Sequence, residues 1–304
     1  MDYILTTDAL GKQYRNFKAL NGLSMHIPKG AIYGFVGKNG AGKTTLIRLI
    51  CGLQAPTFGS YRLYGIPNTS KEITKARRRM GAVVETPSIY TELSARDNLR
   101  EQYRVLGLPS YDGIDELLEL VGLSDAGKKK AKNFSLGMRQ RLGIAVALCG
   151  DPDFLVLDEP ANGLDPEGII EMRELILKLN RNRRITVLIS SHILDELSRL
   201  ATHYGFIDHG QIIKEISAED LDAACRKCTR LQVSDTGILS RVLDEMQLKY
   251  QILSRHEADI FDHPNISVLV QNLAAQNCDV LQVSQRDETL ESYYVSLIGG
   301  VHHA

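Results

Sequence analysis

The chain has 304 residues, of which 43% are apolar and 24% are charged, and its formal net charge is −1. This length corresponds to about two domains, and the composition is that of a soluble globular protein. A net charge near zero excludes a general attraction to nucleic acid or to an anionic membrane, so such a partner would have to be recognised by a local patch.

No apolar run reaches the roughly 18 residues that cross a bilayer, and the opening MDYILTTDALGKQY contains no signal-peptide core. We therefore expect neither a membrane span nor a signal peptide. The odd number of cysteines, five, indicates free thiols in a reducing compartment. Cys225 and Cys228 form a C-x-x-C without a second Cys/His pair at zinc-site spacing, and we interpret them as small residues on one helix.

The first 215 residues or so alternate strand-like and helical stretches, which predicts an α/β fold with a largely parallel sheet. Residues 31–37, AIYGFVG, read as a buried strand that enters a glycine-rich loop, and residues 43–50, KTTLIRLI, as the helix that leaves it. Further core strands are predicted at residues 80–85, 154–158 and 185–190. A helical insert runs from about Ser94, a potential N-cap, to Leu123.

The tail beyond residue 218 has a different pattern. It reads strand, helix, two short strands, helix and strand, followed by a last helix at residues 289–298. The βαββαβ order is that of the split ferredoxin-like motif. We therefore expect a second, small α+β domain.

Residues 37–44, GKNGAGKT, match G-x-x-x-x-G-K-[ST] between a strand and a helix, which is the P-loop pattern. The glycines let the backbone curl so that successive N–H groups face phosphate oxygens. The lysine would reach the β- and γ-phosphates of ATP, and the first threonine would bind Mg²⁺. The predicted nucleotide-binding residues here are Gly37, Lys38, Asn39, Gly40, Ala41, Gly42, Lys43, Thr44 and Thr45.

Residues 154–159, FLVLDE, form an apolar strand that ends in two acids. Buried carboxylates need a cation or a catalytic task to offset their desolvation. We predict that Asp158 holds Mg²⁺ and that Glu159 is the general base that activates water. By itself the motif could equally be a strand that runs into an acidic turn; downstream of a P-loop the catalytic interpretation is favoured.

Residues 134–138, FSLGM, precede an amphipathic helix. An exposed helix N-terminus can receive an anion, because its first N–H groups are unpaired. Considered alone, the segment is better explained as an ordinary helix with Ser135 as its N-cap.

The three motifs, in this order, resemble the nucleotide-binding subunits of ABC transporters, over residues 3 to about 215. The resemblance implies a P-loop NTPase fold, with a RecA-like core, an antiparallel N-terminal β-subdomain and a helical subdomain at about 90–150. The expected domains are residues 1–217 and a small C-terminal α+β domain, residues 218–304.

The same resemblance assigns further site residues. Tyr14 would stack on adenine, although Arg15 stands where the family often has glycine. FSLGM corresponds to the signature loop, in which Ser135 and Gly137 would contact the γ-phosphate. NGLDP resembles the D-loop, with Asp165 as its acid, and SSH places His192 as the switch histidine near the γ-phosphate.

Two positions depart from the family pattern. Glu85 stands where a glutamine normally contacts Mg²⁺ and the membrane partner, and the signature contains Leu136 and Met138 in place of glycine and glutamine. These departures, together with ETPSIY, RQRLGIA and the ending LESYYVSLIGG, are similar to bacitracin- and lantibiotic-type resistance or immunity ATPases. Such a chain would bind and hydrolyse ATP to power export of a peptide antibiotic or a similar amphipathic compound.

The resemblance also implies partners. One P-loop and one signature per chain imply a head-to-tail homodimer with two composite ATP sites. A separate transmembrane permease would hold the chain on the cytoplasmic face of the cell membrane. The alternatives are a soluble ABC-type ATPase that acts on ribosomes or nucleic acid, and a weakly hydrolysing regulatory subunit. We expect no nucleic-acid partner, because the basic runs at 75–79, 127–132 and 181–184 read as solvated helix ends.

Overall fold

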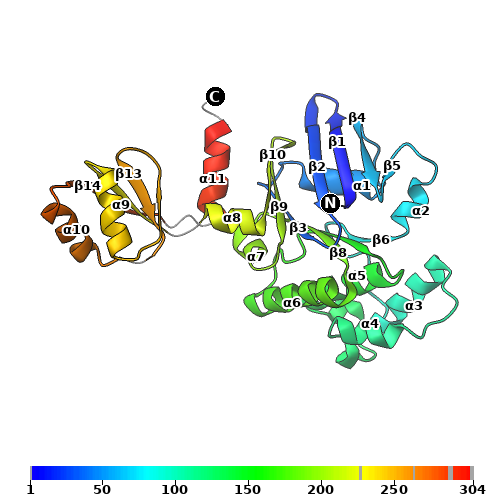
Figure 1. The fold of residues 1–304 in the computed structure, drawn as a ribbon. Coiled ribbons are helices and arrows are strands. Elements are labelled where there is room, and N and C mark those ends of the chain that lie inside the picture. Colours follow the sequence, from blue (N-terminus) through cyan, green and yellow to red (C-terminus); the bar gives the residue numbers. More distant parts are fainter. Residues whose placement is uncertain (1, 226–227, 263, 287–289, 302–304) are drawn as a thin grey trace. The chain divides into compact units, whose positions relative to one another are not determined.

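The computed structural model describes residues 2–225, 228–262, 264–286 and 290–301 (Figure 1). The chain divides into two compact units, residues 1–218 and 219–304. In the described residues the larger unit contains two sheets and the smaller unit one, and each unit has its own apolar core. Within the described part of the chain, no helix combines the length and the apolar character that crossing a membrane requires.

The larger unit contains an antiparallel sheet and a mostly parallel one. The first has the order β2-β1-β4-β5, and the second has the order β10-β9-β3-β8-β7-β6, in which only β10 runs antiparallel to its neighbour. The bounds are β1 Tyr3–Tyr14, β2 Phe17–Pro28, β3 Ile32–Val36, β4 Phe58–Leu63, β5 Ile66–Pro67, β6 Met80–Val83, β7 Phe154–Asp158, β8 Thr186–Ser191, β9 His203–Asp208 and β10 Gln211–Ser217.

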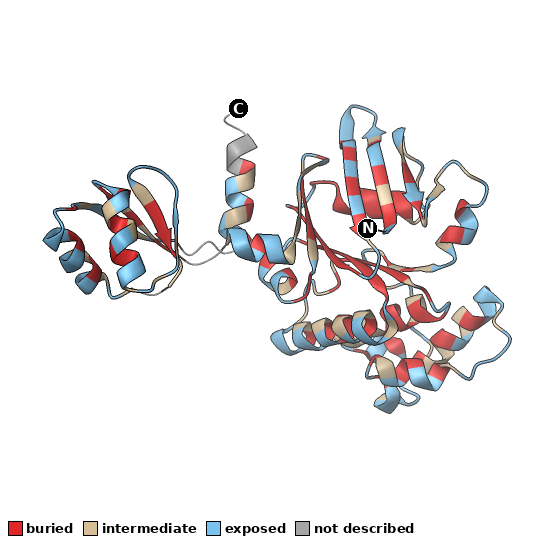
Figure 2. Cartoon of the chain, in the orientation of Figure 1, coloured by how far each residue is buried: buried red, intermediate tan, exposed pale blue. Residues whose placement is uncertain are grey.

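Strands β3, β7 and β8 are buried along their whole length, as central strands of a parallel sheet covered on both faces should be (Figure 2). The predicted α/β core and its antiparallel N-terminal subdomain are confirmed.

The helices of this unit place the loops of interest. Helix α1 packs against both β2 and β7, α5 packs against β6, and α6 packs against β8. The bounds are α1 Lys43–Ile50, α2 Ile73–Arg77, α3 Ala95–Leu106, α4 Ile114–Leu120, α5 Leu136–Leu148, α6 Pro166–Arg183 and α7 Leu194–Ser198, with short 3₁₀ turns at Ser124–Ala126 and Ala131–Asn133. Ser94 caps α3 as expected, its Oγ accepting a hydrogen bond from Asp97 N at 3.2 Å.

The smaller unit consists of α8 Ala218–Ala224, β11 Cys228–Val233, α9 Thr236–Glu245, β12 Tyr250–Ile252, β13 Glu257–Ile260, α10 Ile266–Ala275, β14 Val280–Arg286 and α11 Leu290–Val301. Its strands are antiparallel in the order β12-β13-β11-β14. The predicted βαββαβ order is therefore confirmed, whereas α8 was not predicted. Its core includes Leu231, Leu239, Leu243, Ile260 and Leu269.

One sequence expectation about this unit is wrong. Cys225 lies in the turn after α8 and Cys228 is the first residue of β11, so the two cysteines do not share a helix. Among the described residues, no group of three or more His, Cys, Asp or Glu side chains could hold a metal ion.

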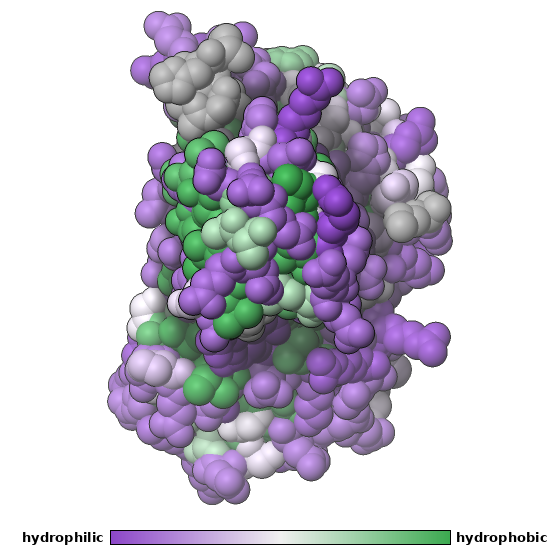
Figure 3. Space-filling view, turned by 60° about the vertical axis from the view of Figure 1, so that its left-hand side comes forward, coloured by the Kyte–Doolittle hydropathy of each residue, from purple (hydrophilic) through white to green (hydrophobic). Residues whose placement is uncertain are grey.

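The surface of the smaller unit mixes polar and apolar side chains. On the face that Figure 3 shows, several hydrophobic residues lie among hydrophilic ones. Exposed apolar side chains in this unit include Ile252, Leu253, Val268, Leu281 and Val283.

Candidate functional site

The P-loop connects β3 to α1, and two of its glycines are required by close packing. A Cβ on Gly37 would lie 2.6 Å from Ile207 O, and a Cβ on Gly42 would lie 2.6 Å from Ala19 O. Gly42 also has φ 113°, a conformation that side chains rarely allow. The loop is thus pressed against the neighbouring backbone, which fixes its shape.

Lys43, the first residue of α1, is only 5% exposed. Its Nζ donates to Gly37 O at 2.6 Å and lies 3.2 Å from Glu159 Oε1. A buried ammonium needs such partners, because they replace the hydrogen bonds to water that it loses on burial. The lysine and the predicted general base, 116 positions apart in sequence, are therefore in contact.

Glu159 follows β7 directly and lies between two cationic or potentially cationic groups. Besides the lysine contact, its Oε2 is 2.6 Å from His192 Nδ1, which follows β8. The backbone of Glu159 has φ 51°, unusual for a residue with a side chain. This geometry brings the predicted base, the P-loop lysine and the switch histidine together at the carboxyl ends of adjacent parallel strands.

Asp158 is 2% exposed, at the end of β7. Its Oδ1 accepts a hydrogen bond from Ser190 Oγ at 2.5 Å, whereas its Oδ2 is buried without a hydrogen-bond partner in the structure. Buried carboxylate oxygens are rarely left unpaired, so this oxygen is suited to a cation or to the water bound to one. Thr44, at the start of α1, is half-buried.

Glu85 lies two residues after the end of β6. Its backbone has φ 60°, which, as for Glu159, is unusual for a residue with a side chain. Its Oε1 forms an ion pair with Arg48 Nη2, of helix α1, at 2.5 Å. The Glu85 side chain is 55% exposed, so the pair lies in solvent-screened surroundings. The contact ties the loop after β6 to the helix that leaves the P-loop.

Tyr14 lies at the end of β1, next to the turn that leads into β2. The ring is 38% exposed, its hydroxyl is hydrogen-bonded to Gln54, and Lys12 Nζ lies 5.2 Å from the ring centroid. Arg15 has φ 50°, which explains why glycine would fit this turn. An aromatic face thus remains available at the surface.

FSLGM begins helix α5, as the capping interpretation predicts. Ser135 Oγ accepts a hydrogen bond from Met138 N at 3.2 Å. Leu136 is 44% exposed, and its Cδ2 lies 3.2 Å from the position of a Cβ on Gly163. The signature segment therefore packs on the 162–166 loop of the same chain.

Asp165 and the remaining P-loop residues complete the predicted set. Asp165 is the N-cap of α6, and its Oδ1 accepts from Gly168 N at 2.9 Å. The side chains of Lys38 and Asn39 are exposed, as is Gly40, whereas Ala41 is buried and Thr45 is half-buried. Asp165, the acid of the D-loop, therefore caps a helix, and residues 38–40 of the P-loop are exposed.

Three residues that contact predicted site residues were not identified from the sequence. Ser190 links Asp158 to the neighbouring strand, Arg48 pairs with Glu85, and Gln54 binds the hydroxyl of Tyr14. Only Ser190 had a signal, since it opens the SSH triplet that contains the histidine.

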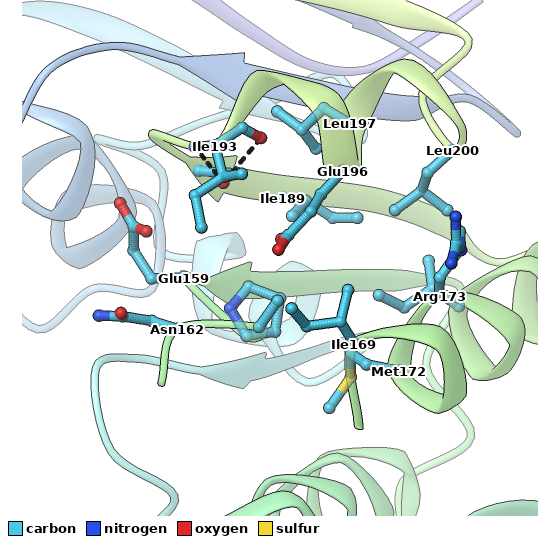
Figure 4. Close-up of a pocket in the computed structure, with 14 residues that line it drawn as sticks. Glu159, Asn162, Ile169, Met172, Arg173, Ile189, Ile193, Glu196, Leu197 and Leu200 are labelled. Carbon is cyan, nitrogen blue, oxygen red and sulfur yellow. Dashed lines mark hydrogen bonds between the residues drawn. The ribbon is translucent and has the colours of Figure 1, made fainter. Parts of the chain in front are cut away.

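A small cavity lies behind Glu159 (Figure 4). Its interior space of about 30 Å³ has room for water but not for a nucleotide. Glu196 of α7 points into it among apolar side chains, and burial raises the pKa of this carboxyl, an effect that the charges of His192 and Arg173 oppose.

The basic runs of the larger unit contact groups within the chain. Arg77 Nε donates to Ile50 O at 3.3 Å, and Lys130 and Lys132 pair with Glu92 at 3.2 and 3.1 Å. Arg183 pairs with Glu116. The runs at 75–79 and 181–184 lie at the C-terminal ends of α2 and α6, as expected, whereas the run at 127–132 lies in the turns between α4 and α5 and not at a helix end.

Comparison with known proteins gives consistent results. Residues 20–162 match the family described as ABC transporter. The Bacitracin transport ATP-binding protein BcrA of Bacillus licheniformis is 42% identical over 304 residues, which cover 99% of this chain and 99% of that protein. The Lantibiotic transport ATP-binding protein SrtF of Streptococcus pyogenes is 43% identical over 212 residues, 70% of this chain and 90% of that protein.

A solved structure shares the fold. It is described as the dimeric structure of a post-hydrolysis state of the ATP-binding cassette MJ0796, bound to ADP and Pi. Its TM-score is 0.64 at 23% identity, and the match covers 70% of this chain and 98% of that one.

Proposed function

This chain belongs to the ABC transporter family and is an ATP-binding, ATP-hydrolysing subunit, and from that premise we propose how its site works and what it powers. The observation that carries the proposal is the placement of Glu159 between Lys43 Nζ and His192 Nδ1, at 3.2 and 2.6 Å. A carboxylate held between a phosphate-binding lysine and a histidine is positioned to accept a proton from the water that attacks the γ-phosphate.

The roles of the three residues follow from these contacts. In the structure Lys43 Nζ is bound by Gly37 O and by Glu159. The phosphates of ATP would bind this ammonium in place of Glu159, and Glu159 would then be able to act as the base. His192 would then orient Glu159 and donate to the γ-phosphate, and Tyr14 would stack on the adenine through its exposed face.

The residues fit Mg²⁺ as well. Asp158 Oδ2 is a buried oxygen that lacks a hydrogen-bond partner, and Thr44 supplies a hydroxyl at the start of α1. We propose that these two residues hold the ion, Asp158 through water, with Glu85 near its outer shell. Bound there, Mg²⁺ would neutralise phosphate charge. Two protein ligands would suffice, because Mg²⁺ usually keeps several of its water molecules.

The signature segment serves a second copy of the chain. A Cβ on Gly137 would meet only Leu164 Cδ2, at 3.7 Å, so the chain's own packing does not require glycine there. Glycine instead keeps the N-terminus of α5 accessible to a phosphate, and Ser135 is exposed beside it. We propose a head-to-tail homodimer in which Ser135 and Gly137 contact the γ-phosphate bound by the partner. The related fold bound to ADP and Pi is itself described as dimeric.

A membrane partner has a suitable docking surface on the edge strand β6. A groove of about 270 Å³ is lined by β6, by Thr86 of the loop after β6, and by residues of α3 and α5 such as Gln102, Leu106 and Val146. Because Thr86 follows Glu85, a helix seated in this groove would move with the loop beside the nucleotide. We propose that a cytoplasmic helix of a separate permease binds here and holds the chain on the inner face of the membrane.

The transported compound is inferred from relatives. Two of them are named for bacitracin and lantibiotic transport, and one covers this chain almost completely. We propose that the permease exports a peptide antibiotic. The test is to purify the chain with a candidate permease, measure ATP hydrolysis, and expose cells that express both to bacitracin and to a lantibiotic. Protection by the pair, but not by either subunit alone, is expected; absence of protection against every peptide would reject the substrate assignment.

A further inference from the structure

Ser190 lies near the end of β8 and has no exposed surface. In the parallel register of β7 and β8 it stands beside Asp158. Its hydroxyl donates to Asp158 Oδ1 at 2.5 Å and accepts from Glu159 N at 3.0 Å. One buried hydroxyl thus contacts two consecutive residues, each of which carries a proposed function.

The first contact orients Asp158. With Oδ1 held by the serine, the carboxylate cannot turn freely, and Oδ2 is the oxygen left without a partner. A charged oxygen that accepts from a hydroxyl is held more firmly than a neutral one. Ser190 therefore determines which oxygen of Asp158 is presented to an incoming cation.

The second contact holds the backbone of Glu159. The Glu159 N–H donates both to Ser190 Oγ at 3.0 Å and to Ser190 O at 3.2 Å. The residue has φ 51°, a strained conformation that persists only when its surroundings enforce it. Because the side chain leaves from this backbone, its position between Lys43 and His192 depends on the same anchor.

We propose that Ser190 is a positioning residue that aligns the metal-binding and the proton-accepting carboxylate with one hydroxyl. The proposal rests on the proposed roles of Asp158 and Glu159. Second-sphere groups of this kind support the ligands that they orient, and their loss typically weakens metal binding or activity 10- to 100-fold.

A purely structural serine would behave differently, and the same strand provides a control. Thr186 opens β8, is fully buried, and its Oγ1 accepts from Gly30 N at 2.9 Å. Thr186→Val removes an equally buried hydroxyl without touching Asp158 or Glu159. Ser190→Ala removes the hydroxyl in question, and Ser190→Cys keeps the side-chain volume while it donates only weakly.

The experiment uses the purified full-length chain. Affinity for a fluorescent ADP analogue is measured with Mg²⁺ and with EDTA, and ATP hydrolysis is measured as a function of Mg²⁺ concentration. For both Ser190 variants we expect the affinity for the ADP analogue in EDTA to be unchanged. The factor by which Mg²⁺ increases that affinity should fall about tenfold, and turnover should fall roughly 10- to 100-fold. Thr186→Val should match the parent in all three measurements.

Three results would overturn the proposal. The first is parental Mg²⁺ dependence and turnover in Ser190→Ala. The second is restoration by Ser190→Cys, which would assign the effect to packing volume. The third is an equal loss in Thr186→Val, which would assign the effect to strand stability. If the parent chain failed to hydrolyse ATP, the proposed function would fall, while the Mg²⁺-dependent nucleotide affinity would still decide the role of Ser190.

Discussion

Replacing Glu159 by glutamine removes one negative charge and leaves the shape of the side chain nearly unchanged. That charge lies 3.2 Å from Lys43 Nζ and 2.6 Å from His192 Nδ1. Because Glu159 is the proposed proton acceptor, its loss should lower turnover by about 10² to 10⁴, the usual contribution of a general base. This range corresponds to roughly 3–5 kcal/mol of activation free energy.

The affinity for ATP, unlike turnover, should not fall. At 3.2 Å and an effective dielectric constant of about 20, the attraction between Lys43 and Glu159 is about 5 kcal/mol before desolvation is counted. Glu159→Gln removes this competitor for the lysine and a like charge near the γ-phosphate. ATP affinity should therefore stay the same or increase, and the ATP-bound dimer should accumulate because it cannot be hydrolysed.

The assays are phosphate release at saturating ATP and gel filtration with ATP and Mg²⁺. The matched control is Glu196→Gln, which changes a neighbouring carboxylate of the same cavity that contacts neither Lys43 nor the P-loop in the described contacts. Turnover at the parental rate in Glu159→Gln would refute the assignment of the base. An equal loss in both variants would mean that the cavity as a whole matters, rather than proton acceptance by Glu159.

Three further predictions concern the same unit. Lys43→Ala should weaken ATP binding at least tenfold, because it removes the cation that reaches the phosphates; unchanged affinity in a fluorescent-nucleotide titration would contradict the P-loop assignment. Glu85→Gln breaks the exposed ion pair with Arg48 and should change the free energy of unfolding by no more than about 1 kcal/mol, without raising the KM for ATP; a tenfold rise in KM would show that the carboxylate is needed. Burial lowers the pKa of His203 more than Glu215 raises it, so its folded pKa lies below its unfolded one, and stability present above pH 6.5 or so should be lost as the pH falls through the folded pKa. His203→Gln should flatten that acid-side decline in thermal unfolding, and an unchanged pH profile would exclude a contribution from this histidine.

The fold was largely predictable because its signals are local. The apolar runs that became β3, β7 and β8 are buried along their whole length, and their burial explains both the runs and the parallel pairing. The helix α8 was missed because it is short, with one buried residue, Leu221, and no repeating apolar face. The interpretation of Cys225 and Cys228 as one helix was wrong for a related reason: C-x-x-C spacing alone does not distinguish two residues of one helix from a turn residue and a strand residue.

The groups that can be assigned from the sequence are those whose geometry depends on only a few neighbouring residues. A glycine-rich turn between a strand and a helix sets the P-loop, and the serine ahead of α5 sets its cap, because backbone curl and N-cap bonding need only neighbours along the chain. Tertiary structure alone decided the contacts between distant segments. The hydroxyl of Ser190 meets Asp158, 32 positions away, only because β7 and β8 are in register, and Lys43 meets Glu159 only because the P-loop and the end of β7 lie at the same edge of the sheet. Register and sheet order depend on how the whole core packs, and no short stretch of sequence contains that information.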